Sequence, residues 1–258
     1  MHAENACNST TIRAWCQAVG LLLAVAIALA ACRSGELSVN EVTVLADAIP
    51  VADNNGRLLY VSGVVRSEET LRDSVLGIEE PVIALISRVE MYQWQEFNHE
   101  SGFSRHQAQS PRRVRYRPVW ASHVIDSSAF EKASSYRNPD HMPMSSSLIR
   151  SNRVRLGAFR LDPEWIGHEQ FAEHYPMSRA HLMHWPESLH ERIDDRQPDW
   201  LYIGDPLMPR IGDWRIRVQV VREQPVSLLA VQRGDVLEPV GLEYLAAGLV
   251  SVEELLAQ

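Results

Sequence analysis

The chain has 258 residues, of which 25 are Lys or Arg, 33 are Asp or Glu, and 45% are hydrophobic. This composition is typical of a globular protein with a core, and it excludes a fibre, a disulfide-framed miniprotein and a polytopic membrane protein. The net charge of −8 argues against a general nucleic-acid binder. Cys7, Cys16 and Cys32 all lie near the N-terminus, so the body of the chain can form no internal disulfide and no thiolate metal site.

An uncharged stretch near the N-terminus predicts contact with a membrane. Residues 14–32 separate Arg13 from Arg33 and carry no charge. As a helix rising ~1.5 Å per residue they would span roughly 28 Å, which matches the hydrocarbon thickness of a bilayer. We therefore expect a short tail over residues 1–13, a membrane anchor or signal over residues 14–32, and a body on the extracytoplasmic side, periplasmic or lumenal.

Two outcomes remain open for this segment. The first is an uncleaved transmembrane helix. The second is cleavage before Cys32, because residues 29–32 (LAAC) resemble a bacterial lipoprotein signal in which that cysteine would be lipidated. The region before the apolar stretch is weakly basic for a secretion signal, because Arg13 is its only cationic side chain and Glu4 carries the opposite charge.

Alternating apolar and polar residues predict an α+β body, predominantly antiparallel β with a few short helices. The strand patterns cover, in chain order, residues 57–65, 81–96, 113–120, 152–161, 214–221, 226–232 and 235–240. The last two are expected to form a hairpin through Arg233 and Gly234. Residues 97–112 and 131–151 are polar and are expected to be loops.

Period-two alternation also assigns side chains to faces. One face of residues 81–96 is expected to carry Arg88, Glu90, Tyr92 and Trp94, and the other Val89, Met91, Gln93 and Gln95. The aromatic residues Tyr92, Trp94, Tyr116 and Trp120 are expected to pack as core where the two strands pair.

Two helix starts stand out. Asp162 before Pro163 and Glu164 is typical of a helix N-terminus and predicts a helix through the residues that follow. Ser251 with Glu254 resembles a capping box that opens a short terminal helix.

An ordered set of short motifs resembles the transmembrane protein 43 (LUMA) family. The longest is residues 89–96 (VEMYQWQE), and Tyr116, Trp120 and the run Gly212-Asp213-Trp214-Arg215 follow in order. The resemblance covers roughly residues 40–254. It singles out as family motif and core residues Glu90, Tyr92, Trp94, Tyr116, Trp120, Gly212, Asp213 and Arg215.

The resemblance implies a membrane span followed by a large extracytoplasmic domain, here residues 40–258. Family members carry further spans near the C-terminus, which would begin where this chain stops, at Gln258. The resemblance also implies that the protein is a membrane-tethered scaffold that catalyses no reaction and binds no cofactor. The expected partners are the membrane through residues 14–32, other membrane or envelope proteins, and a second copy of the chain, but no nucleic acid.

The alternative function is a metal-dependent hydrolase, and it rests on five histidines. They fall within residues 168–190, and His181 with His184 could place two ligands on one helical face. The spacing of a zinc-protease helix is not met, since His168 and His174 are six residues apart rather than four. A polar surface with incidental histidines is the favoured interpretation.

Arg113, Arg115 and Arg117 form a cationic stripe with three interpretations. It could face anionic lipid headgroups, bind an acidic partner, or be a solvated strand face paired with carboxylates of the same domain. The third interpretation is favoured.

Overall fold

The computed structural model describes residues 37–99 and 113–257. The chain divides into two units, Met1–Glu41 and Val42–Gln258. In the described part of the first unit lies the short 3₁₀ helix η1 (Val39–Glu41). The expected membrane segment, residues 14–32 with Cys32, lies outside the described residues. Within residues 37–99 and 113–257, no helix is long and apolar enough to cross a bilayer.

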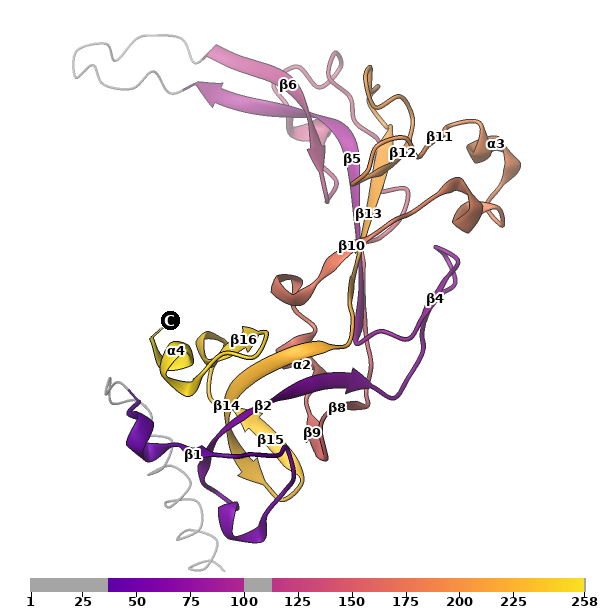
Figure 1. Ribbon diagram of the computed structural model, residues 1–258. Coiled ribbons are helices and arrows are strands. Elements are labelled where there is room, and N and C mark those ends of the chain that lie inside the picture. The colour runs from indigo at the N-terminus through magenta and orange to yellow at the C-terminus, as the bar shows by residue number, and fades with distance from the viewer. Residues whose placement is uncertain (1–36, 100–112, 258) are drawn as a thin grey trace, which may run out of the picture. The chain divides into compact units, whose positions relative to one another are not determined.

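The first sheet of the larger unit contains seven strands in the order β1-β2-β8-β9-β15-β14-β16. Their bounds are β1 Thr43–Val44, β2 Leu58–Ser67, β8 Val154–Leu156, β9 Phe159–Leu161, β14 Gln224–Arg233, β15 Val236–Pro239 and β16 Leu245–Ala247. Strand β14 also pairs with β2, and Figure 1 shows these two long strands curving side by side. The pairs β1–β2 and β9–β15 are parallel, and the others are antiparallel.

The second sheet has the order β11-β12-β13-β5-β6, with β10 paired to β13 and β7 to β5. Its bounds are β5 Ala84–His99, β6 Arg113–Ala121, β7 Ser147–Arg150, β10 Glu173–Tyr175, β11 Ile193–Asp194, β12 Leu201–Ile203 and β13 Trp214–Val221. All of its pairings are antiparallel. Figure 1 shows β5 running beside β13 and then continuing with β6 as a long hairpin.

Short elements connect the sheets. Strands β3 (Leu71–Asp73) and β4 (Ile78–Glu80) form a separate hairpin. The helices are α2 Pro163–Ile166, α3 Glu187–His190 and α4 Val252–Leu256, with 3₁₀ helices η2 Ala52–Asn54, η3 Ser127–Ala129, η4 Glu169–Phe171, η5 Arg179–Leu182 and η6 Leu242–Tyr244. The β-rich architecture with few short helices confirms that part of the predicted fold class.

The two central strands of the second sheet bury the face that alternation predicts. On β5, Val89 and Met91 are buried while Arg88 is exposed. On β13, Ile216 and Val218 are fully buried. Fully burying each such side chain stabilises the fold by ~1.5–3 kcal/mol relative to exposure, so the register of these strands is strongly determined.

The helix expected after Asp162 is much shorter than predicted. Its start is confirmed, because the Asp162 carboxylate accepts a hydrogen bond from the Glu164 amide at 2.9 Å. The helix ends at Ile166, and Glu173–Tyr175 forms β10, which pairs with β13. Pairing in the sheet and burial therefore override a local preference for helix.

Two expected loops also contain strand. Strand β5 continues to His99, and β7 occupies Ser147–Arg150. The predicted hairpin through Gly234 is confirmed, and so is the capping box, in which Ser251 and Glu254 exchange hydrogen bonds.

Candidate functional site

The site is built around an ion pair across the second sheet. Arg215 on β13 lies directly opposite Glu90 on β5. Its Nε and Nη2 donate to Glu90 Oε2 at 3.0 and 2.6 Å. The two side chains are only 19% and 18% exposed. This partly desolvated, charge-assisted pair is stronger than a surface salt bridge.

Aromatic rings enclose the Arg215 guanidinium. Its central carbon lies 4.1 Å from the ring centroid of Trp200 and 4.5 Å from that of Trp120, and Nη1 donates to the Tyr202 hydroxyl at 3.2 Å. Tyr92 extends the group, with its ring 5.0 Å from Trp120. We call this group the Arg215 cage: Glu90, Tyr92, Trp120, Trp200, Tyr202 and Arg215. Because Arg215 itself fills the cage, the surface available to a partner is the outer side of half-buried rings.

A glycine turn places Arg215 in the cage. Gly212 donates its amide to the Tyr92 carbonyl at 2.9 Å, and Tyr92 donates to the Asp213 carbonyl at 2.7 Å. Two residues of one strand thus oppose a single residue of the other, as in a β-bulge with glycine at its first position. Gly212 has φ +92°, which glycine adopts at little cost. The next residues alternate, so Trp214 enters the core and Arg215 enters the cage.

The Asp213 carboxylate fixes this turn. Oδ1 accepts from Arg192 Nη2 at 2.7 Å, and Oδ2 accepts from the Arg210 amide at 2.8 Å. Gly204 approaches so closely that an added Cβ would lie 2.3 Å from Asp213 Cγ. The motif from Gly212 to Arg215 therefore fixes the start of β13 against β5.

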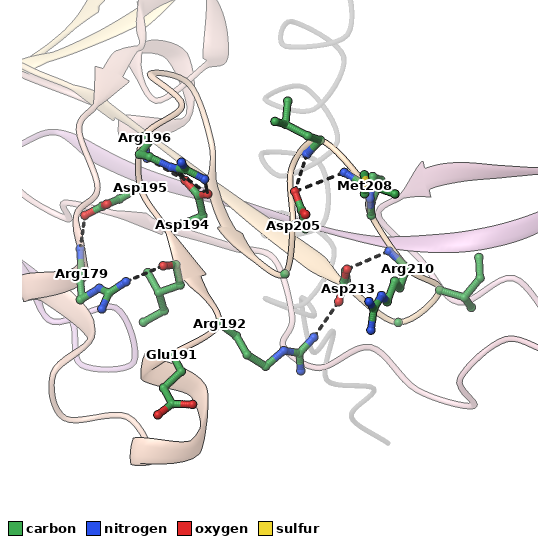
Figure 2. A pocket seen from close by; sticks show the side chains of 16 residues that line it. Arg179, Glu191, Arg192, Asp194, Asp195, Arg196, Asp205, Met208, Arg210 and Asp213 are labelled. Atoms are coloured by element: carbon green, nitrogen blue, oxygen red, sulfur yellow. Dashed lines mark hydrogen bonds and ion pairs between the residues drawn. The ribbon is translucent and has the colours of Figure 1, made fainter.

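A charged pocket of about 1300 Å³ borders the turn. Figure 2 shows two of its basic side chains pointing toward acidic ones, while Glu191 has no partner among the residues drawn. Arg192 reaches Asp213, and Arg196 is paired with Asp194. The hydrogen bond from Arg196 lowers the pKa of the Asp194 carboxyl. Serine, cysteine and histidine are absent from the described lining, whose charges instead hold its loops together.

A second aromatic group lies further along β5 and β6. Tyr136 stacks on Tyr116 with ring centroids 3.9 Å apart and meets Trp94 edge-on at 5.0 Å. The Tyr116 hydroxyl donates to Glu96 at 2.6 Å. Burial, followed by this carboxylate, raises the pKa of the Tyr116 phenol. The Asn138 side chain joins the group to the sheet, because it bonds both the amide and the carbonyl of Trp94.

The structure brings the eight family-motif residues to one region of the second sheet, but the four aromatic residues among them lie outside the core in which they were expected. Tyr92, Trp94, Tyr116 and Trp120 are half-buried. The main core of this sheet lies on the opposite face of β5 and β13, where alternation puts their neighbours. Sequence reasoning missed Trp200, Tyr202 and Tyr136. The alternation of Trp200 and Tyr202 could have indicated a shared face, whereas the contact with Tyr136 depends on a loop.

The two histidines proposed as metal ligands have separate partners. Both Ser178 and Tyr175 hydrogen-bond to the ring of His181, at 3.1 and 3.4 Å from its Nδ1 and Nε2. The Nε2 atom of His184 lies 3.0 Å from the Val75 carbonyl oxygen. In residues 37–99 and 113–257, no group of three or more His, Cys, Asp or Glu side chains could hold a metal ion.

Comparison with known proteins gives one consistent result. The family model described as Transmembrane protein 43 matches residues 91–258. The chain is 28% identical over 198 residues to Transmembrane protein 43 of Rattus norvegicus, covering 72% of this chain and 48% of that protein. For the Homo sapiens protein the identity is 27% over the same coverage. A Drosophila melanogaster homolog is 30% identical over 112 residues, 42% of this chain and 30% of that protein.

The chain thus spans about half the length of the mammalian relatives it matches. No solved structure matches it.

Proposed function

Because this chain belongs to the transmembrane protein 43 family, we propose that it is a membrane-tethered interaction domain that assembles with other membrane proteins and catalyses no reaction. Its body lies on the extracytoplasmic side, and residues 14–32 supply the tether. The name of these relatives, Transmembrane protein 43, supports a membrane setting.

The Arg215 cage is the observation that carries the proposed interaction role. Tyr, Trp and Arg dominate the binding energy of protein interfaces, and here they share one half-exposed face. Their orientations are already held by the Glu90 ion pair and by tilted and edge-on contacts between the rings. A partner would therefore lose little conformational entropy from these side chains on binding.

Photocrosslinking of the full chain in its native membrane tests this role. The crosslinking amino acid p-benzoylphenylalanine replaces Trp200, which lies in the cage, and in a matched control it replaces Leu249, which is 69% exposed in the loop between β16 and α4. We expect discrete crosslinks to membrane proteins from position 200 and not from position 249. Equal or absent products at both positions would contradict the proposal.

Two further variants test the tether. Deleting residues 1–32 is expected to release a soluble, folded body, and continued pelleting with membranes in high salt would argue against a single tether. Cys32→Ala distinguishes the two kinds of tether. It should abolish incorporation of labelled fatty acid if the segment is a lipoprotein signal, and change neither size nor location if the segment is a transmembrane helix.

A further inference from the structure

Strand β6 lies at the edge of the second sheet. It pairs with β5 along its whole length, from His99 opposite Arg113 to Met91 opposite Ala121. Among the described residues, no other strand pairs with it. An edge strand presents backbone donors and acceptors that can accept a further strand.

The hydrogen bonds of β5 identify which groups of β6 point outward. Both backbone groups of Tyr92 bond on the β13 side, and those of Trp94 bond to Asn138. Neither residue therefore bonds to its opposite residue on β6, Trp120 or Pro118. In an antiparallel pair such residues direct their backbone groups away from the partner strand.

By the same alternation, Val114 and Tyr116 also point their backbone groups outward. Pro118 has no N–H to offer, which suits its place at an edge. The amides of Val114, Tyr116 and Trp120 remain, and within the described part of the chain no hydrogen bond outside the β5–β6 pairing reaches them and no strand other than β5 pairs with β6.

Charge selects what can bind this edge. Arg115 and Arg117 are exposed on one face of β6, and Arg117 stacks over Phe97 at 4.0 Å. Their exposure agrees with the solvated strand face that the sequence favoured, and neither forms an ion pair within 4.0 Å with any described residue. Pairing β6 with a second copy of itself would bring such arginines together, and like charges across strands are unfavourable.

We propose that the outer edge of β6 binds an extended acidic segment of a partner protein, which adds to the sheet as a further strand. Carboxylates at every second position would face Arg115 and Arg117. The intervening apolar side chains would lie beside Tyr116 and Trp120. This inference rests on the proposed interaction role and names one partner chemistry for it. The whole chain carries a net charge of −8, so its overall electrostatic field does not attract an acidic segment. Selection must therefore come from the local contacts with Arg115 and Arg117 and from backbone pairing with β6.

Fluorescence anisotropy with the full chain in detergent tests the proposal. The probe is a labelled peptide, Val-Glu-Val-Glu-Val-Glu-Val, and the comparison peptides carry Lys in place of Glu, or N-methyl groups at alternate residues. We expect the acidic peptide to bind at least about tenfold more tightly than either comparison peptide. Equal binding of the acidic and basic peptides, or of the N-methylated peptide, would overturn the proposal.

Three variants locate the binding. The double variant Arg115→Glu, Arg117→Glu should weaken binding of the acidic peptide about tenfold or more, whereas the control Arg57→Glu, Arg66→Glu, with the same charge change on exposed residues elsewhere, should not. Val114→Pro removes an outward amide without breaking a bond to β5, so it should fold like the parent and bind less well.

Two further results would overturn the proposal. One is a wild-type dimer that Val114→Pro dissociates without peptide, since a second copy would then be the occupant. The other is no binding of the acidic peptide at about 1 mM. Crosslinks from position 200 could persist in that case, so failure at this edge is distinguishable from failure of the interaction role.

Discussion

Arg215 and Glu90 lie opposite each other in the register of β13 and β5, and their side chains pair at 2.6 Å with less than a fifth of either exposed. The pair has packing on both sides, because Trp120 and Trp200 cover the guanidinium. Stacking between rings and a forked hydrogen bond are both properties of arginine that lysine lacks. The relationship therefore explains why an arginine, rather than any cation, stands at this position.

Arg215→Lys should lower the free energy of unfolding by about 2 kcal/mol although it keeps the charge. Urea denaturation of the two proteins at neutral pH measures this. The control is Arg233→Lys, whose partner Glu238 lies 3.2 Å away in a pair more than half exposed, and there we expect a change under about 0.5 kcal/mol. Similar small changes in the free energy of unfolding at both positions would show that the cage does not specifically stabilise an arginine at position 215.

Gly204 and Gly212 should respond differently to alanine. At Gly212 the new Cβ would meet Pro139 at an ordinary 3.5 Å, so only the positive φ costs energy, about 1–2 kcal/mol. At Gly204 the Cβ would collide with the Asp213 carboxylate at 2.3 Å and displace it from Arg192, so we expect a loss of about 3 kcal/mol or more.

The control for both is Gly234→Ala. Gly234 has φ +64° with nothing within 4 Å of an added Cβ, so its cost should resemble that of Gly212→Ala. Thermal and urea unfolding give the ranking. If Gly204→Ala lowered the free energy of unfolding no more than Gly234→Ala does, the close approach of Gly204 to Asp213 would not be present.

Glu69 should contribute to the acid sensitivity of the fold. Its pKa lies below the ordinary 4.5, chiefly because the Asn152 amide donates to the carboxylate at 2.6 Å, and next because the Ser151 hydroxyl donates at 2.9 Å. The folded state thus favours the ionised form. The resulting stability is fully present above the ordinary pKa and is lost as pH falls through the lower, folded pKa.

Glu69→Gln should therefore be less stable than the parent at pH 7 but lose less stability between about pH 5 and pH 3. Urea midpoints across this range measure the slope. The control Glu187→Gln, at an exposed helix position, should leave the slope unchanged. A Glu69→Gln protein with the parent's acid slope would contradict the assignment.

The faces of β5 and β13 could be predicted because burying one face of a sheet imposes a period of two on the sequence. The length of α2 could not, since whether the chain continues as helix depends on β10 finding β13. The cage was predictable only in part: Glu90 and Arg215 belonged to the motif, but their pairing requires the long-range register of two strands. The alternation of Trp200 and Tyr202 indicates only that the two rings share a face, and Tyr136 reaches its partners from a loop with no local sign of the contact.

The aromatic residues offer a test of how far the half-exposed face stabilises the fold. Alternation and strand pairing suggested that Trp120 packs as core, for which truncation to alanine costs ~3–5 kcal/mol. The structure leaves Trp120 half-buried against Tyr92 and Arg215, so we expect Trp120→Ala to cost about 2 kcal/mol. Trp214→Ala is the matched control, because Trp214 is 6% exposed and stacks on Trp185 at 5.4 Å, and it should cost the full ~3–5 kcal/mol.

Urea unfolding measures both variants, and crosslinking from position 200 reports binding in the same proteins. Trp120→Ala should lose crosslinks while it remains folded, since a half-exposed ring can serve a partner as well as the fold. A cost equal to that of Trp214→Ala would place Trp120 in the core. A cost below about 0.5 kcal/mol would instead show that the ring contributes nothing to the fold and that the cage is not preordered.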